Sequence, residues 1–257
     1  MGVIDQRRVT EAFDHAEGYA SHAHVQRRIA ADLALRIAAL DLPAPPKILE
    51  IGCGTGFLTA ALLACGVDGD WLITDKAPAM VARCQEAIGP AANRRFARLD
   101  GEYDLAALDR PFDLICASMA MQWFDDVPKA VSGLIGKLAP GGHLVFNTLT
   151  AGTFAEWHTA HRSIAHAAGA LQLPPRAELE NSLGALSPLL LSGETYVERF
   201  ADARNFLRDL KAIGASTPRP DHVPLPASQM RRVMRAFEAG GASVSYEVLT
   251  CHFRKAD

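Results

Sequence analysis

Glycine recurs at every second position in Gly52, Gly54 and Gly56, directly after residues 48–51, which are apolar except for Glu50. Glycine adopts positive φ and lets the backbone approach a ligand at distances that a Cβ atom would prevent. A helix is expected over residues 57–65, so its unpaired N–H groups would point at whatever lies in the turn. The pattern predicts a strand that ends in a tight, ligand-holding turn, although dinucleotide-binding folds use a similar glycine spacing for a pyrophosphate.

Glu50, two residues before the first glycine, distinguishes two kinds of ligand. Glu50 places a carboxylate where a pyrophosphate would be repelled and an ammonium group would be attracted. S-adenosylmethionine carries such an ammonium on its methionine portion and has no phosphate. We therefore expect an S-adenosylmethionine site at this turn.

Carboxylates also follow the next two expected strands. Residues 71–74 are followed by Asp75, about 20 residues beyond the turn, as a ribose-binding carboxylate requires. Pro78 opens the next helix, so capping of that helix is the alternative role for Asp75. A third strand, 94–99, ends at Asp100. Because ligands bind outside the carboxyl ends of parallel strands, these strand ends predict a single pocket.

The following segments continue the alternation of strands and helices. Strands are expected at 112–117 and 143–148, with a helix over 127–138 between them. The sequence Ala-Pro-Gly-Gly at 139–142 would end that helix, because proline cannot continue it and glycine closes it. This alternation predicts an open α/β sheet.

Together these features resemble the class I S-adenosylmethionine-dependent methyltransferases over roughly residues 40–150, including a Leu-x-Pro-Gly-Gly motif at 138–142. The resemblance implies an α/β, Rossmann-like fold whose seven-stranded, mostly parallel sheet has helices on both faces and a helical cap after the fifth strand. It also implies that Asp75 binds the ribose, that Asp100 faces the adenine and that Ser118 lies beside the methionine end. The implied cofactor-binding residues are Glu50, Gly52, Gly54, Gly56, Asp75, Lys76, Asp100, Gly101 and Ser118.

The whole chain is expected to form one enlarged domain of 257 residues. We divide it into an N-terminal helical lid (1–40), the cofactor-binding core (41–150), and a segment with the cap, a basic helical excursion and the last two strands (151–257). Residues 1–10 are polar and lack the apolar core of a signal peptide, and no run approaches the roughly 20 apolar residues that span a bilayer. These features predict a cytoplasmic protein that is not bound to a membrane.

The cysteine and histidine patterns favour neither disulfides nor a metal site. Five cysteines without a C-x-x-C pair are expected to be small buried hydrophobic residues. His158 and His161 lie one helical turn apart, and a partly exposed helix face is a better explanation for them than a metal site.

Long segments after the fifth strand are expected to hold the acceptor. About 35 residues separate the fifth strand from the sixth, and a helical pattern over 153–168 predicts an inserted cap. A second excursion, 201–241, precedes the final strand at 244–253. At the other end of the chain, the segment around Tyr19 could pack under the next helix or fold over the cofactor and exclude water.

These flanking segments resemble those of malonyl-acyl-carrier-protein O-methyltransferases. The matching pieces are Ala12-Phe13 with Tyr19, His22, Ala23 and Gln26, Gln122-Trp123 with Asp125-Asp126, Phe146-Asn147-Thr148-Leu149 with Gly152 and Glu156, and residues 207–215. The resemblance implies methylation of the free carboxylate of a malonyl thioester on acyl carrier protein, the reaction that opens the pimeloyl part of biotin synthesis. An acidic carrier partner would complement residues 199–257, which hold ten Lys or Arg against six Asp or Glu, unless these charges form an ordinary solvated face.

The cap departs from that family at one position. Its members often show Asn-Arg-Phe-Leu, whereas this chain has Leu171 at the arginine position. Another cation would then bind the malonyl carboxylate, or the substrate differs. Arg199, Arg208 and Lys211 are the candidates for substrate binding, with surface solvation as the default explanation for each.

Carboxylate methylation needs no general base, because a carboxylic acid with a pKa near 4 is already ionised at neutral pH. We expect alignment and water exclusion to dominate, with Tyr19 and Gln122 donating hydrogen bonds to the substrate. Two alternatives remain: a methyltransferase of the same fold that acts on another small carboxylic acid or a quinone-ring carbon, and a non-catalytic protein that binds the nucleoside or the carrier. Nucleic acid is not expected as a partner, since the net charge is −3.

Overall fold

A single seven-stranded sheet organises the chain in the computed structural model, which describes residues 5–16, 18–215, 218 and 222–256. The strands are β1 (Lys47–Ile51), β2 (Asp70–Asp75), β3 (Arg94–Arg98), β4 (Phe112–Ser118), β5 (Leu138–Leu149), β6 (Leu190–Arg199) and β7 (Ser243–Arg254). The α-helices are α1 (Gln6–Asp14), α2 (Tyr19–His22), α3 (His24–Ala38), α4 (Phe57–Ala64), α5 (Pro78–Ile88), α6 (Val127–Gly136), α7 (Ala155–Arg162), α8 (Arg176–Gly184), α9 (Ala203–Ala212) and α10 (Ala227–Ala239). Short 3₁₀ helices follow β3 (η1, Leu105–Ala107) and β4 (η2, Met121–Trp123).

The strand order is β3-β2-β1-β4-β5-β7-β6. The first five strands pair in parallel, whereas β7 runs antiparallel to both β5 and β6. The carboxyl ends of β1 to β5 therefore meet along one edge, and the order reverses direction at β1, between β2 and β4. This is the seven-stranded, mostly parallel fold that the sequence predicts, and the reversal is the place where open α/β sheets bind ligands.

Helices cover both faces of the sheet. On one face, α3, α4 and α5 pack against Ile48, Trp71 and Ile73, which are fully buried. On the other face, α6 and α8 cover Phe112 and Phe146. Strands that are buried on both faces have nearly continuous apolar sequences, which explains why β1 and β4 are easily recognised in the sequence.

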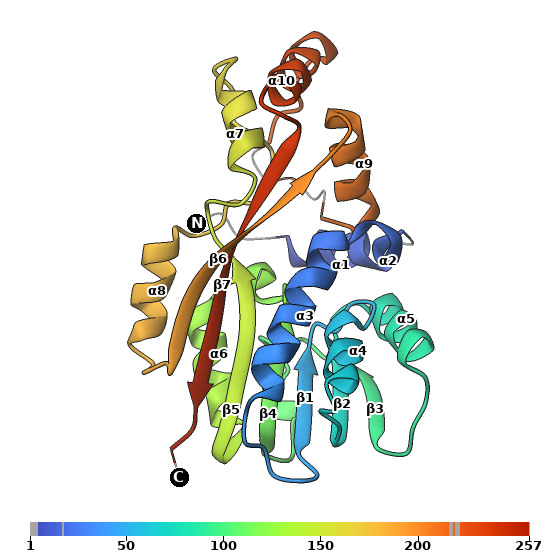
Figure 1. The fold of residues 1–257 in the computed structure, drawn as a ribbon, viewed down its shortest axis with the longest axis vertical. Coiled ribbons are helices and arrows are strands. Elements are labelled where there is room, and N and C mark those ends of the chain that lie inside the picture. Colours follow the sequence, from blue (N-terminus) through green and yellow to red (C-terminus); the bar gives the residue numbers. More distant parts are fainter. Residues whose placement is uncertain (1–4, 17, 216–217, 219–221, 257) are drawn as a thin grey trace.

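A third apolar core lies beyond the parallel strands, at the ends of β6 and β7. The long strands β6 and β7 extend beyond the parallel strands and carry α7, α9 and α10 at that end of the molecule (Figure 1). There Trp157, Phe206, Phe237 and Tyr246 pack together, with the rings of Trp157 and Phe206 5.2 Å apart. This core forms the cap, and it stands above the strand ends at which the glycine turn lies.

The expected boundaries around β5 and the cap helix are wrong. The expected helix 127–138 ends at Gly136, and residues 139–142 belong to β5, where the pairing with β4 shifts register between Phe112 and Leu114. Gly141 adopts a φ of +72° within this irregularity, so these glycines form a bulge and do not stop a helix. The cap helix is shorter than 153–168, because Phe154 and Ala165 both take positive φ and confine α7 to the residues between them. The sequence also gave no indication of α8.

Within the described part of the chain, no helix is long and apolar enough to cross a membrane.

Candidate active site

The glycine turn after β1 has the backbone conformation that its sequence predicts. Gly52, Gly54 and Gly56 have φ values of +68°, +53° and +89°. A Cβ atom on Gly52 would lie 2.4 Å from that of Ala120, so this position admits only glycine. Gly52 and Gly54 line a crevice of about 100 Å³. Gly56 lies behind it, where a Cβ would meet Cys84 at 3.1 Å, so its constraint is the contact between the turn and α5.

Asp75 joins the turn to the start of the next helix. Its Oδ2 accepts a hydrogen bond from the Gly54 N–H at 2.9 Å, and its Oδ1 accepts one from the Ala77 N–H at 2.8 Å. Burial raises the pKa of this carboxyl, and the two hydrogen bonds lower it by a smaller amount. Asp75 therefore stabilises both the turn and the beginning of α5, and a carboxylate with about four acceptor sites keeps capacity for two ribose hydroxyls.

The far end of the crevice is formed by the segment after β3. Lys76 Nζ lies 2.7 Å from Asp100 Oδ2, and Asp100 Oδ1 accepts a hydrogen bond from the Glu102 N–H at 3.0 Å. A Cβ on Gly101 would lie 2.3 Å from Ile51 Cγ2, so this loop also packs closely against β1. Lys76, Asp100 and Gly101 all line the crevice.

Glu50 is 1 % exposed and lines a small cavity of about 30 Å³ beside the turn. Its carboxyl group accepts a hydrogen bond from the Thr59 hydroxyl. Burial raises the pKa of Glu50 to about 8, so the carboxyl is largely protonated at neutral pH before a cation is present. A bound ammonium group would favour the ionised form.

The segment after β4 is held by a residue whose role the sequence did not indicate. Asn147 Oδ1 accepts hydrogen bonds from the Met119 N–H at 2.8 Å and from the Ser118 hydroxyl at 3.4 Å. Met119 has a φ of +56°, a strained conformation for a residue with a side chain. Asn147 and Thr148 lie inside an apolar strand and are 1 % exposed. Polar residues in an otherwise apolar strand were the only feature of the sequence that pointed to a role for Asn147.

Helix α1 closes the crevice from outside. Gln6 Nε2 donates to the Trp123 carbonyl at 2.8 Å, and Gln6 Oε1 accepts from Lys76 Nζ at 3.0 Å. At the other end of the helix, Asp14 accepts from the Ala79 N–H at 3.0 Å, and Arg83 donates to the Asp14 carbonyl. By contrast, α3 packs on the sheet beside α4. The covering part of the N-terminal segment is thus α1 with α2.

Tyr19 lies where three cavities meet. Together with Met119 it lines the crevice, the small cavity beside Glu50 and a larger cavity under the cap. Its ring packs 6.0 Å from that of Phe57, and its hydroxyl makes no hydrogen bond to any other described residue. Burial and the nearby charge of Asp75 raise the pKa of Tyr19 well above its ordinary value, so the phenol stays protonated and can donate.

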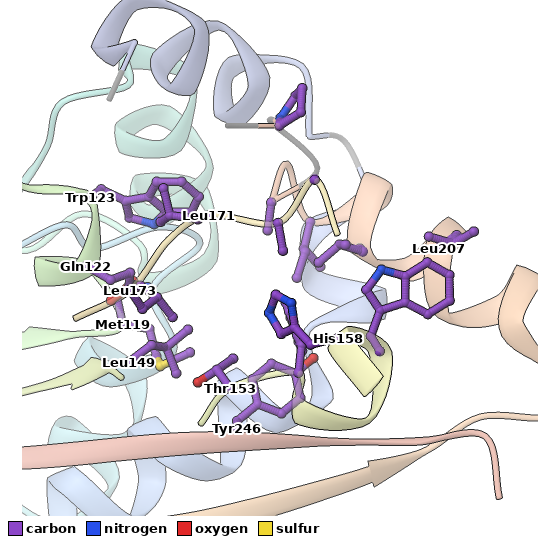
Figure 2. A pocket seen from close by; sticks show the side chains of 18 of the residues that line it. Met119, Gln122, Trp123, Leu149, Thr153, His158, Leu171, Leu173, Leu207 and Tyr246 are labelled. Atoms are coloured by element: carbon purple, nitrogen blue, oxygen red, sulfur yellow. Dashed lines mark hydrogen bonds between the residues drawn. The ribbon is translucent and has the colours of Figure 1, made fainter. Parts of the chain in front are cut away.

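The cavity under the cap has a volume of about 230 Å³ and a mostly apolar lining. Figure 2 shows Met119, Gln122 and Trp123 at one end and Leu207 toward the other, with the His158 ring between them. Leu171, at the position where the related family often has arginine, also faces this cavity. Among the described lining residues there is no lysine or arginine.

Two buried glutamines bring polar atoms to this apolar surface. Gln122 Nε2 donates to the Met119 carbonyl at 2.6 Å and keeps a second N–H, whereas its Oε1 is buried without a partner among the described residues. Gln26, 8 % exposed on α3, lines both this cavity and the one beside Glu50, and its Oε1 is also unpartnered there. The sequence drew attention to Gln26 only as part of a resemblance.

The three basic residues predicted to bind the acceptor lie outside this cavity. Leu207 and Leu210 of α9 line it, whereas the neighbouring Arg208 and Lys211 are exposed. The side chain of Arg208 is 65 % exposed and lies 3.3 Å from Asp209 Oδ1. Arg199, at the end of β6, is also exposed.

Two side-chain environments differ from expectation. Four cysteines are buried, but Cys65 is exposed at the end of α4. The face of α7 that carries His158 and His161 was expected to be partly exposed; His158 is half-buried, whereas His161 is 2 % exposed and faces the cap cavity. The described residues contain no cluster of three or more ligands that could hold a metal ion.

The crevice suits an adenosyl cofactor. Its glycines leave space that a Cβ would fill, Asp75 and Asp100 line it, and Glu50 lines the adjoining small cavity. Thr55 Oγ1 and Gln26 Oε1, both buried without partners among the described residues, line the cavity beside Glu50. These polar atoms would bind the amino and carboxylate groups of a methionine moiety.

Comparisons with known proteins identify the class. A family model described as "Methyltransferase domain" matches residues 19–186. The fold is similar to that of an S-adenosylmethionine-dependent methyltransferase from Mesorhizobium loti, with a TM-score of 0.50 and 20 % identity over 88 % of this chain and 98 % of that one. The protein is therefore a class I methyltransferase, and S-adenosyl-L-methionine is its methyl donor.

Closer relatives define the family. The chain is 38 % identical over 251 residues to the malonyl-[acyl-carrier protein] O-methyltransferase of Magnetococcus marinus, covering 94 % of this chain and 90 % of the relative. It is 42 % identical over 253 residues to the biotin biosynthesis bifunctional protein BioCD of Bordetella avium, covering 98 % of this chain but only 53 % of that longer protein. The chain belongs to the malonyl-[acyl-carrier protein] O-methyltransferase family.

Proposed function

We propose that this protein methylates the free carboxylate of a malonyl thioester on acyl carrier protein and so supplies an esterified precursor for biotin synthesis. Relatives that carry this name match nearly the whole chain, including the cap. The structural observation that carries the proposal is the meeting of the cofactor crevice and the cap cavity at Tyr19 and Met119. An acceptor in the cap cavity would meet the methyl donor at this junction.

The side chains at the junction favour an acceptor that is already ionised. Phe13, Tyr19, Met119 and Trp123 line both the crevice and the cap cavity, and none of them is a base at neutral pH. The histidines further inside are weak bases, since burial lowers the pKa of His158 and lowers that of His161 to about 4. A carboxylate requires no proton removal, whereas an alcohol or an amine acceptor would.

The protein would contribute alignment and a dry environment. When bound, S-adenosyl-L-methionine supplies a sulfonium methyl group that a carboxylate oxygen can displace. Tyr19 and the second N–H of Gln122 would orient that carboxylate through neutral hydrogen bonds, which leave the oxygen more nucleophilic than an ion pair would. Helix α1 and the cap would exclude water, and such positioning contributes several kcal/mol in well-aligned systems.

The exposed cations are placed to bind the carrier protein, not the acyl group. Arg208 and Lys211 follow the cavity-lining residues Leu207 and Leu210 on α9, and Arg231 follows the cavity-lining Met230 on α10. We propose that these residues, with Arg199, Arg232 and Arg235, bind substrate from outside the cavity by contacting an acidic carrier protein. The reaction would then take place in the cytoplasm, where carrier proteins and the methyl donor occur together.

A quinone-ring carbon is the second candidate acceptor. It is favoured by one observation: the described lining of the cap cavity contains no arginine or lysine, and Leu171 stands at the position where the resemblance implies an arginine. A neutral ring would need no cation, although it would need a base for the proton that the ring carbon loses.

A methyl-transfer assay with labelled S-adenosylmethionine separates these candidates. The acceptors are malonyl carrier protein, malonyl coenzyme A, free dicarboxylic acids and a quinone precursor. We expect transfer mainly to malonyl carrier protein, with label that mild alkali releases because the product is an ester. Transfer only to the ring carbon, with label that resists alkali, would overturn the proposal.

A further inference from the structure

His161 on α7 is a buried polar side chain whose ring nitrogens make no hydrogen bond within the described part of the protein. It is 2 % exposed, and neither ring nitrogen has a hydrogen-bond partner among the described residues. Its ring packs edge-on against Trp157 at 5.0 Å, so an apolar neighbour fixes its orientation. A neutral imidazole has one donor and one acceptor, and burial without partners for either is costly. Such a group is expected to be satisfied by a ligand.

The neighbouring His158 is in a different situation. It is half-buried and lines both the cap cavity and a second cavity of about 690 Å³ along the loop after α7, where water can satisfy its ring. Of these two cavities, His161 lines only the cap cavity. Of the two imidazoles on this face of α7, His161 is therefore the one that depends on an occupant of the cap cavity.

The position of His161 indicates which part of the acceptor it meets. The reacting carboxylate must lie at the junction with the crevice, beside Tyr19 and Met119. His161 does not line the crevice, so it faces a part of the acceptor that lies behind the reacting group. In a malonyl thioester that part begins with the thioester carbonyl, a neutral hydrogen-bond acceptor.

The charge state of His161 agrees with such a partner. Burial, with smaller contributions from His166, His158 and His222, lowers the pKa of His161 to about 4. The ring is therefore neutral at physiological pH and can donate one N–H. A neutral donor suits a carbonyl, and it does not draw the negative carboxylate away from the junction.

We propose that His161 is a specificity-determining residue that donates a hydrogen bond to the thioester carbonyl of the acyl group. This inference rests on the proposed function. It means that the enzyme distinguishes a malonyl thioester from carboxylic acids of similar length by a group that takes no part in the displacement. The apolar Leu171 and the neutral His161 would together replace a charged recognition group in the cap.

The test compares two small acceptors that differ only at the carbonyl. The first is the malonyl thioester of N-acetylcysteamine, and the second is the thioether 3-[(2-acetamidoethyl)thio]propanoate, in which CH₂ replaces C=O. For the wild type we expect kcat/KM to favour the thioester about tenfold, the size expected for one neutral hydrogen bond. His161→Phe should reduce this preference to near one, and His161→Gln, which keeps an N–H donor, should restore part of it.

His166→Phe is the matched control, because His166 lies in the same cap segment but does not line the cap cavity. It should keep the wild-type preference. Thermal melting and S-adenosylhomocysteine affinity show whether each variant is folded, and if His161→Phe is not folded, His161→Leu, which also lacks a donor, takes its place. A wild-type preference that persists in the folded variant without a donor, or no preference in the wild type, would overturn the inference. Failure to methylate any malonyl thioester, including malonyl carrier protein, would instead refute the proposed function.

Discussion

The carboxylates of the cofactor crevice and the polar groups of the cap cavity are in opposite states. In the crevice, Asp75 accepts hydrogen bonds from the Gly54 and Ala77 N–H groups, and Asp100 accepts one from the Glu102 N–H. In the cap cavity, Gln122 and His161 keep buried atoms without partners among the described residues. The crevice is thus shaped and held by the protein itself, whereas the cap cavity is completed by its ligand. Preorganisation of this kind favours tight cofactor binding, and an incomplete lining favours selection of the acceptor.

The largest expected effect comes from filling the crevice. Gly52→Ala would place a Cβ 2.4 Å from that of Ala120 and would force a residue other than glycine to a φ of +68°. We expect S-adenosylhomocysteine to bind roughly 100-fold more weakly by isothermal titration, since strain and steric closure act together. Gly66→Ala is the control, because Gly66 has a φ of +81° but open space around it. Equal losses of affinity in both variants would mean that the shape of the crevice is not decisive.

Residues of the crevice could be predicted from the sequence because their constraints are local. Gly52 follows β1 directly, Asp75 is the last residue of β2 and Asp100 lies two residues after β3, so a strand assignment also places each residue at the edge of the sheet. The central strands β1 and β4 are nearly continuous apolar runs, and the alternation with helices predicts that the strands run parallel. The bulge at Gly141 interrupts the regular pattern, and residues 139–142 were therefore predicted to end a helix although they belong to β5.

Residues of the cap cavity could not be predicted in the same way. The lining combines α3, α7, α9 and α10, which meet only through tertiary packing. Leu207 and Arg208 are adjacent on α9, so a small difference in the orientation of the helix decides which of them faces the cavity. Arg208 was predicted to bind the substrate because its positive charge suits a carboxylate. His161 was expected on a partly exposed face, because the sequence does not show that Trp157 and the neighbouring helices bury it.

The second prediction concerns proton uptake at Glu50, whose pKa is raised by burial to about 8 from its ordinary value of 4.5. The folded protein retains this proton between about pH 4.5 and pH 8, where the unfolded chain has lost it, so stability falls as the pH rises through this window. A ligand ammonium favours the ionised form, so binding releases the proton. We expect S-adenosylhomocysteine affinity to rise roughly tenfold from pH 6 to pH 8 in the wild type, and to change little in Glu50→Gln.

Isothermal titration in buffers of different ionisation enthalpy measures this proton release directly. Glu86→Gln, on the exposed side of α5, should behave like the wild type. If Glu50→Gln keeps the full pH dependence, another group releases the proton on binding, and Glu50 is not the residue that attracts the ligand ammonium.

A smaller effect is expected at the junction of the two regions. Tyr19→Phe removes a hydroxyl that has no partner among the described residues but keeps the ring packed near Phe57. We expect kcat to fall roughly fivefold, the loss of one orienting hydrogen bond, with cofactor affinity within about twofold of the wild type. Tyr103→Phe, which removes an exposed hydroxyl bonded to Asp125, is the control. Turnover and acceptor affinity that are both unchanged in Tyr19→Phe would remove the hydroxyl from the mechanism.

The smallest effect is expected outside both cavities, at the exposed cations of α9 and α10. Because Lys211 and Arg232 do not line the cap cavity, charge reversal to Glu should leave methylation of the small malonyl thioester unchanged. The same variants should raise KM for malonyl carrier protein roughly threefold each at low salt, and the difference should shrink at high salt, since exposed charges are screened. Steady-state kinetics with both acceptors, and Arg7→Glu on exposed α1 as control, separate carrier docking from acyl recognition. Equal loss on the small thioester and on the carrier would place these cations in acyl recognition after all, and the division between a charged outer surface and a neutral cavity would then have to be abandoned.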